Sequence, residues 1–178
     1  MLKTDNLLIR PFDLVEVEVL FHFQVKNRDF FEKFAITRPE RFYTIDYQKE
    51  LLERWQNNWQ EDTVYQFGIF LQEQLIGLIQ LFQVVRGPLQ SAYIGYFIDR
   101  NLNGKGYGTE SVKAVVDYAF TQLSLHRIEA GVMPHNMGSL KVLQKAGFEI
   151  EGLSRKNVKI NGKWEDHHLL AIINPKDL

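Results

Sequence analysis

The sequence contains no cysteine among its 178 residues. This absence excludes disulfide bonds, thiolate metal ligands and a thioester formed on the protein itself. The sequence also lacks an apolar run of the roughly 20 residues that cross a membrane. Its opening, MLKTDNLLIRPF, is too polar for a secretory signal. We therefore expect a cytoplasmic protein that has no membrane partner.

The sequence also has no large excess of charge of either sign, because it contains 21 Lys and Arg residues and 22 Asp and Glu residues. A net charge of -1 gives no bulk attraction toward nucleic acid, so we expect no direct nucleic-acid binding. Hydrophobic residues make up 45% of the chain, which is typical of soluble globular proteins. Since no linker, repeat or low-complexity segment divides the chain, we expect one domain over residues 1–178.

Hydrophobic periodicity predicts strands and helices in the order βααβββαβαββ. The expected strands cover residues 7–12, 65–71, 75–85, 90–98, 127–132, 148–160 and 163–173. Helices are expected at residues 45–60, 106–123 and 139–146. A further helix is expected to open at a capping box formed by Asp13 and Glu16, with apolar positions at Val15, Val19, Leu20 and Phe23. This order predicts an α/β protein with a mixed sheet of about seven strands and about four helices.

Two short signals define the end of the chain more closely. Gly147 follows the last expected helix and is a candidate for its C-cap. The pair Asn161 and Gly162 is the preferred sequence for a two-residue hairpin turn between the last two strands.

Three glycines alternate in the segment NGKGYGT at residues 103–109, between an expected strand and the most regular expected helix. Glycine leaves room for a ligand, and the first N–H groups of a helix are unpaired donors at the positive end of its dipole. Such a corner binds anions, and Lys105 and Thr109 can add a charge and a hydroxyl to a bound pyrophosphate. The alternative is a glycine turn that serves only to fit a tight corner.

Two common nucleotide-binding motifs do not match this segment. A Walker A loop needs four residues between its glycines and a final Lys-Ser/Thr, and both are missing. A dinucleotide fingerprint needs Gly-x-Gly-x-x-Gly, whereas the spacing here is Gly-x-Gly-x-Gly after what reads as a meander of strands.

The loop and its flanks, IGYFIDRNLNGKGYGTESVKAVVDYAF, resemble the acetyl-CoA binding motif of the GNAT N-acetyltransferases, Gln/Arg-x-x-Gly-x-Gly/Ala. Asn103 stands at the Gln/Arg position, and Gly106 and Gly108 stand at the glycine positions. The segment NMGSLKVLQKAGFEIEG is similar to the second motif of that family. The opening TDNLLIRPF and the closing INGKWEDHHLLAI are similar to the RimJ/RimL branch, which acetylates the N-terminal amine of ribosomal proteins.

The resemblance implies a mostly antiparallel sheet that splays between its fourth and fifth strands, at residues 93–98 and 127–132, with acetyl-CoA in the gap. The main chain of Phe97, Ile98 and Asp99 would hold the pantetheine like an added strand. Asn136 would contact the same arm, and no metal is implied. The pyrophosphate would lie on the loop, whose implied cofactor residues are Asn103, Gly104, Lys105, Gly106, Tyr107, Gly108 and Thr109.

Direct acetyl transfer requires a deprotonated amine and a stabilised leaving thiolate. The resemblance puts Ser139 beside the thioester sulfur, where its hydroxyl would donate a hydrogen bond. Tyr93 replaces the Glu that many GNAT enzymes carry in this strand, and Leu143 replaces their usual Tyr. We expect Tyr93 or a chain of waters to relay the amine proton.

Glu61 and Asp62 are alternative bases, because Rim-type enzymes carry a working carboxylate in that region. The competing interpretation of both residues is a solvated helix end.

An α-amine has a pKa of 7.7–8.0, against 10.4 for lysine. Deprotonating an N-terminal acceptor therefore costs about 3 kcal/mol less free energy than deprotonating a lysine. The first hypothesis is therefore an acetyl-CoA-dependent N-acetyltransferase acting on a protein N-terminus, most simply a ribosomal one. A second is acetylation of a small amine such as a polyamine, amino acid or antibiotic, which favours an acidic pocket. A third is an acyl-CoA sensor without catalysis. Either a monomer or a homodimer is compatible with the sequence.

Overall fold

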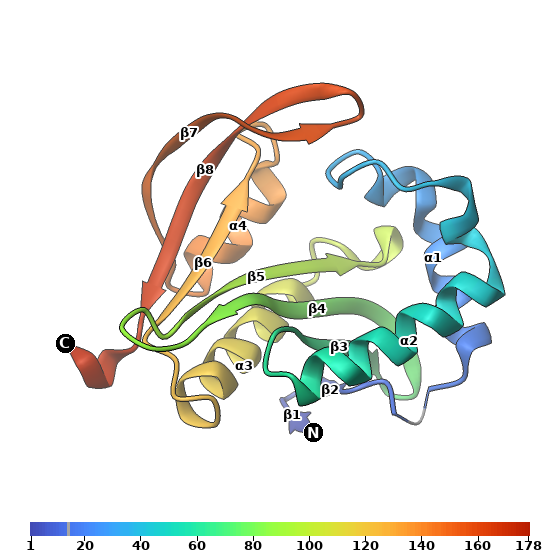
Figure 1. The fold of residues 1–178 in the computed structure, drawn as a ribbon, viewed down its shortest axis with the longest axis horizontal. Helices are drawn as coiled ribbons and strands as arrows, with labels where there is room; N and C mark the ends of the chain where they lie inside the picture. The colour runs from blue at the N-terminus through green and yellow to red at the C-terminus, as the bar shows by residue number, and fades with distance from the viewer. Residues whose placement is uncertain (14) are drawn as a thin grey trace.

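One sheet of eight strands organises the molecule, in the order β1-β2-β3-β4-β5-β6-β8-β7 (Figure 1). The computed structural model describes residues 1–13 and 15–178. The strands are β1 (Leu2–Lys3), β2 (Leu7–Arg10), β3 (Tyr65–Leu71), β4 (Gln74–Val85), β5 (Ser91–Ile98), β6 (Arg127–Val132), β7 (Glu149–Ile160) and β8 (Lys163–Ile173). The helices are α1 (Val17–Phe31), α2 (Ile45–Gln60), α3 (Tyr107–Thr121) and α4 (Met137–Lys145), with short 3-10 helices η1 (Glu40–Tyr43), η2 (Arg100–Leu102) and η3 (Pro175–Asp177).

The mixed α/β sheet expected from the sequence is confirmed, and all seven expected strands are present. The eighth strand is β1, whose two residues pair with the far end of β2. A strand this short carries no readable period, which is why the sequence pattern missed it. None of the helices in the described part of the chain is long and apolar enough to cross a membrane.

The sheet splays between β5 and β6, as the family resemblance implied. These two strands pair in parallel over only three positions, from Ser91 with Arg127 to Tyr93 with Glu129. The closed end is pinned by the Gln90 carbonyl, which accepts from the N–H of His126 at 2.7 Å and of Arg127 at 3.2 Å. Beyond Tyr93 the two strands diverge into the open V of Figure 1.

Helices cover both faces of the sheet and create two cores. On one face, α3 and α4 bury Val112, Val115 and Leu143 against β4, β5 and β6. On the other face, α1 buries Phe23 and Phe31, and the partly buried side chains of α2 pack beside them. The same strand serves both cores, because Tyr96 and Phe97 of β5 point to opposite faces and pack against different clusters. The gap beside β5 is therefore reached from both faces.

The first helix begins later than the sequence pattern predicted, and the capping box is wrong. Glu16 is itself the N-cap residue and makes no side-chain capping bond. The chain first makes a turn in which the Val15 N–H donates to the Phe12 carbonyl at 3.0 Å, while the Phe12 ring is buried in the core. Val19 is exposed, and the buried face of α1 instead includes two polar residues, Gln24 and Asn27.

The remaining helices and turns agree with the sequence pattern within two residues. Gly147 has a φ of 100° directly after α4, and the N–H of Phe148 donates to the Leu143 carbonyl, so the predicted C-cap is confirmed. Asn161 and Gly162 both have positive φ between β7 and β8, which is the geometry of the predicted two-residue turn.

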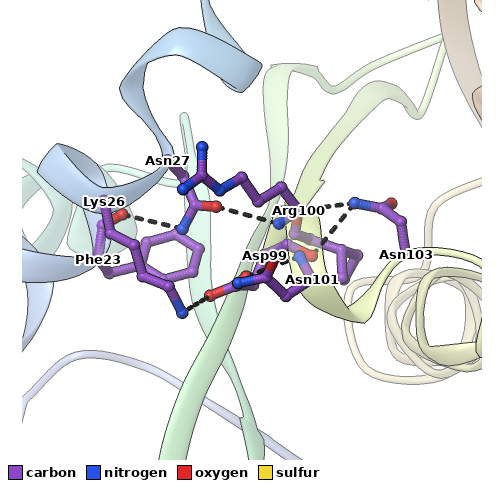
Figure 2. Close-up of polar contacts among 8 residues, drawn as sticks. Phe23, Lys26, Asn27, Asp99, Arg100, Asn101 and Asn103 are labelled. Carbon is purple, nitrogen blue, oxygen red and sulfur yellow. Dashed lines mark hydrogen bonds and ion pairs between the residues drawn. The ribbon is translucent and has the colours of Figure 1, made fainter.

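A buried polar network joins α1 to the loop that follows β5 (Figure 2). Lys26 Nζ donates to Asp99 Oδ2 at 2.6 Å, and the Arg100 N–H donates to Asn27 Oδ1 at 3.0 Å. Asn103 Nδ2 closes the loop from the other side, donating to the carbonyls of Ile98 and Asp99 at 3.2 Å each. Because the Asp99 side chain is buried, this charge is stable only with its partners in place.

These partners determine how Asp99 titrates. Burial by itself raises the pKa of a carboxyl group, but the bonds from Lys26 and from the Asn101 N–H outweigh it and hold the pKa of Asp99 below its usual value. A carboxyl whose pKa is lower in the folded state stabilises the fold above its unfolded pKa. That contribution is lost as the pH falls through the folded value.

We predict that Asp99→Asn lowers the free energy of unfolding by about 1–3 kcal/mol at neutral pH, because the charge-assisted bond from Lys26 is lost. The difference between the wild type and the variant should shrink as the pH falls below about 4. Urea unfolding at a series of pH values measures both effects. Asp177→Asn, which changes an exposed contact with the His126 ring, is the control and should cost less than about 1 kcal/mol. Equal losses in the two variants would contradict the assignment.

Candidate active site

A cleft of about 1140 Å³ occupies the open side of the V. Its walls come from the end of β5, the start of α3, the start of α4, β6 and the segment between α1 and α2. The far end is bridged by the tip of the β7–β8 hairpin, where Asn161 Nδ2 donates to the Glu32 carbonyl at 2.9 Å. The cleft therefore connects the two faces of the sheet at the point where β5 has no neighbour.

The glycine loop, residues 103–109, forms one end of this cleft, and its glycines have different roles. Gly104 and Gly106 have φ values of 78° and 91°, and a Cβ on either would meet no atom within 4 Å. Gly106 is the N-cap of α3 and offers no side chain to the N–H groups of the first turn. Gly108 instead is buried, and a Cβ there would lie 3.4 Å from Val142 of α4. Two glycines thus shape an open anion cradle, and the third allows α3 and α4 to pack closely.

Most residues expected to bind the cofactor line this one cleft. They are Phe97, Ile98, Asn103, Gly104, Gly106, Gly108, Thr109, Asn136 and Ser139. The other three lie outside it. Lys105 is exposed on the loop, Tyr107 packs against the core, and Asp99 is buried beneath the loop in its pair with Lys26.

The free edge of β5 is set by strand alternation. The Asp99 N–H donates to the Ile76 carbonyl at 2.8 Å, and the register pairs Phe97 with Leu78. In an antiparallel pair, alternate residues direct their main-chain groups to opposite edges. Asp99 and Phe97 are therefore engaged with β4, whereas Tyr96 and Ile98 direct N–H and C=O groups toward the gap, where the Ile98 carbonyl already accepts from Asn103 Nδ2. This geometry does not support the expectation that Phe97 and Asp99 offer free main-chain groups. Tyr96, whose main-chain groups do face the gap, was not among the expected residues.

Tyr96 also crosses the cleft with its side chain. Its phenol oxygen lies 2.8 Å from Ser139 Oγ and 3.3 Å from the Ser139 carbonyl oxygen, so its single proton can be donated to either of them. Burial raises the pKa of Tyr96 to about 12, although the bond to Ser139 acts in the opposite direction. The phenol is therefore protonated at neutral pH and is a hydrogen-bond donor.

Ser139 is held in place from its own helix as well. It lies in the first turn of α4, where its N–H donates to Asn136 Oδ1 at 3.2 Å. Asn136 thus acts as the N-cap of α4, and its position in the cleft follows from that bond.

The other two expected catalytic residues do not reach the cleft. In the part of the chain that the structure describes, neither Tyr93 nor Glu61 contributes to its walls. Tyr93 lies at the closed end of the V, where it packs on Phe82 and the adjacent Glu129 raises the pKa of its phenol. Glu61 is the exposed C-cap of α2. A general base must lie within hydrogen-bond reach of the proton it accepts, so these positions give neither residue a direct role.

Asp62 is engaged elsewhere too. Arg86 Nε lies 2.6 Å from its carboxylate, and the Tyr65 hydroxyl donates to it at 2.6 Å. The bond from Arg86 holds the pKa of Asp62 below its usual value. Asp62 therefore fastens the α2–β3 turn to the β4–β5 turn.

The cleft is basic. Its titratable side chains among the described residues include Arg38, Arg54, Lys141 and Lys145 but no Asp or Glu. The two lysines lie on α4, on the same side as the glycine loop. On the opposite wall, Arg54 lies in α2 and Arg38 in the segment between α1 and η1.

Comparison with known proteins agrees with this geometry. The model of the acetyltransferase (GNAT) domain matches residues 6–149. "Probable N-acetyltransferase YjcK" of Bacillus subtilis (strain 168) is 52% identical over 99% of both chains. "[Ribosomal protein uS5]-alanine N-acetyltransferase" of Escherichia coli (strain K12) is 31% identical over 98% of this chain and 91% of its own length.

A solved structure supports the same relationship. Mycobacterium smegmatis RimJ, in complex with a CoA-disulfide, is 26% identical and covers 97% of this chain and 83% of its own, with a TM-score of 0.91. The family model, the two relatives and the RimJ structure all agree with the fold described above, in which a splayed sheet and a glycine loop border one cleft. The chain belongs to the GNAT acetyltransferases, and its relatives include the ribosomal-protein alanine N-acetyltransferases.

Proposed function

We propose that this acyltransferase moves an acetyl group from acetyl-CoA to the N-terminal α-amine of a protein, and that the acceptor is a ribosomal protein. The observation that carries the proposal is the single open cleft that joins the anion cradle at Gly106 to the Tyr96–Ser139 pair. The ribosomal acceptor draws support from the 31% identity to the uS5-alanine enzyme. A ribosomal acceptor also agrees with the expected cytoplasmic location.

The donor would bind on the α3 and α4 side of the cleft. The N–H groups at the start of α3 suit the pyrophosphate, and Thr109 adds a hydroxyl on the cleft wall. The edge groups of Tyr96 and the N–H of Ile98 suit the amides of pantetheine, as in strand addition. The RimJ structure, which holds a CoA-disulfide, supports CoA as the carrier of the acetyl group.

The acceptor would approach from the α1 and α2 side. A polyamine calls for carboxylates, and the described lining of the cleft has none. An α-amine also needs less help with deprotonation than lysine, since about a tenth of N-termini are neutral at pH 7. These two points favour a protein N-terminus over the small-amine alternative and over lysine.

In the transfer, the neutral amine nitrogen bonds to the thioester carbonyl carbon, the C–S bond breaks, and the sulfur leaves with the electron pair. The amine gives up one proton to water, and the departing sulfur gains one. When the Tyr96 hydroxyl donates to Ser139 Oγ, the Ser139 proton is free to point at the sulfur. Ser139 would thus stabilise the leaving group, and Tyr96 would orient it.

The first prediction concerns the acceptor. Thiol release from acetyl-CoA should be fastest with peptides that carry a free N-terminal amine. Matched peptides with a blocked N-terminus and one free lysine should be much slower, and so should spermidine. Fastest release with spermidine would select the small-amine alternative, and CoA binding without release from any acceptor would select the sensor.

The second prediction concerns the cradle. Gly106→Ala should weaken CoA binding at least about tenfold, because a side chain strains the left-handed backbone and narrows the pyrophosphate site. Gly87→Ala is the matched control, since Gly87 also has a positive φ and open space around its Cβ but lies in the β4–β5 turn. Calorimetry should find unchanged CoA affinity for this control. Equal affinity for both variants would remove the loop from the binding site.

The third prediction concerns the leaving group. Ser139→Ala should lower kcat at least about tenfold while CoA affinity stays within about twofold, because only the transition state uses the hydroxyl. Tyr96→Phe should lower kcat less, and the double variant should be no slower than Ser139→Ala, since the two act as one unit. Ser154→Ala on β7 is the control. Full turnover by Ser139→Ala with normal CoA affinity would show that this assignment is wrong.

A further inference from the structure

Two guanidinium groups on the acceptor side of the cleft, those of Arg38 and Arg54, take part in no described ion pair, and of these only Arg38 is partly buried. Arg38 lies between α1 and η1 and is half-buried. Among the described residues, it takes part in none of the ion pairs, although nearby Arg28 pairs with both Glu32 and Glu40. An Arg in a protected position usually has an anionic partner, so its partner here is expected to come from outside the chain.

Neighbouring side chains fix the position of Arg38 without neutralising it. Its guanidinium lies 4.4 Å from the centre of the Phe42 ring, and its Nη1 donates to Gln24 Oε1 at 3.2 Å. Tyr43 is adjacent, but its hydroxyl donates to Glu32 Oε1 at 2.6 Å, and Arg28 already lies 3.5 Å from that carboxylate. The cation is therefore preorganised and keeps donors available.

Arg38 lies close to β5, the strand that carries Tyr96. The Arg38 guanidinium lies 5.7 Å from the centre of the Phe97 ring, and Phe97 follows Tyr96 on β5. Phe97 packs on the α1 face of the sheet and Tyr96 on the α4 face. The open edge of β5 therefore lies between Arg38 on one face and the Tyr96 hydroxyl on the other. Three residues of extended chain span about 10 Å, enough to run from this edge to Arg38.

We infer that the acceptor wall, the side of the cleft that carries Arg38 and Arg54, selects protein N-termini with an Asp or Glu side chain within the first four residues. The Arg38 guanidinium binds this carboxylate. The inference rests on the proposed N-terminal acetylation and adds to it a specificity-determining residue. Arg54, on the same wall, reinforces the positive potential. A planar guanidinium can meet a carboxylate with two parallel bonds, which gives the wall its preference for acids.

Seven-residue peptides with a free N-terminal Ala, scanned with Asp, Asn or Lys at positions 2, 3 and 4, test this inference. For at least one position the wild type should show kcat/KM about tenfold higher with Asp than with Asn, the size expected for one charge-assisted bond. Arg38→Gln should bring this ratio close to one, and Arg38→Glu should shift the preference to Lys. Because each ratio is taken within one variant, partial loss of folded protein does not affect it.

Arg41→Gln is the matched control, because Arg41 also stacks on an aromatic ring, 4.9 Å from the centre of Tyr47, but is exposed and outside the cleft. This variant should keep the wild-type ratio. A wild-type ratio near one at all three positions, or a ratio that survives Arg38→Gln, overturns the inference while leaving N-terminal acetylation intact. Faster turnover of free aspartate than of any peptide would also overturn it. Failure to acetylate any of the peptides would instead count against the proposed function.

Discussion

The parting of β5 from β6 after Tyr93 is the constraint on which the rest of the structure depends. Strands in the interior of a sheet use all of their main-chain groups in pairing, so a sheet without this gap would have no place for an extended ligand. Here the Gln90 carbonyl fastens one end of the gap, and beyond it the edge of β5 has no strand beside it. The open edge, the start of α3 and the start of α4 then meet around one cleft.

A second consequence is that the two sides of the cleft are mechanically connected. Helix α1 reaches the loop that follows β5 through Lys26 and Asn27 and continues into the segment that carries Arg38. The tip of the β7–β8 hairpin closes the far end by contacting the end of the same helix. One helix thus helps to position the glycine loop, the segment that carries Arg38 and the tip of the β7–β8 hairpin.

Much of this architecture could be predicted from local sequence. Periods of two and of 3.6 residues located seven strands and four helices, because the buried faces of these elements are apolar. The glycine loop was recognisable from its position between a strand and a helix. The exception was α1. Its start was predicted from a capping box that does not form, and farther along the helix its buried face carries Gln24 and Asn27, so polarity there did not indicate exposure.

The contact between Tyr96 and Ser139, to which we assign the leaving-group role, could be predicted only in part. Ser139 follows from the second motif, but its partner Tyr96 lies 43 residues away, and such a contact depends on the packing of α4 across the gap. One signal was available: Tyr96 has the same strand parity as the buried Ile94 and Ile98, whereas Tyr93 does not. Arg38 gave no sequence signal at all, because the absence of a carboxylate partner becomes visible only in three dimensions.

The most direct test of this account is amide hydrogen exchange with and without CoA. If the main-chain N–H groups of the glycine loop hold the pyrophosphate, exchange should slow at residues 104–109 and along the open edge of β5, and remain unchanged in the β4–β5 turn. CoA that binds while exchange in that loop stays the same would contradict the account, because the donor would then lie elsewhere on the molecule.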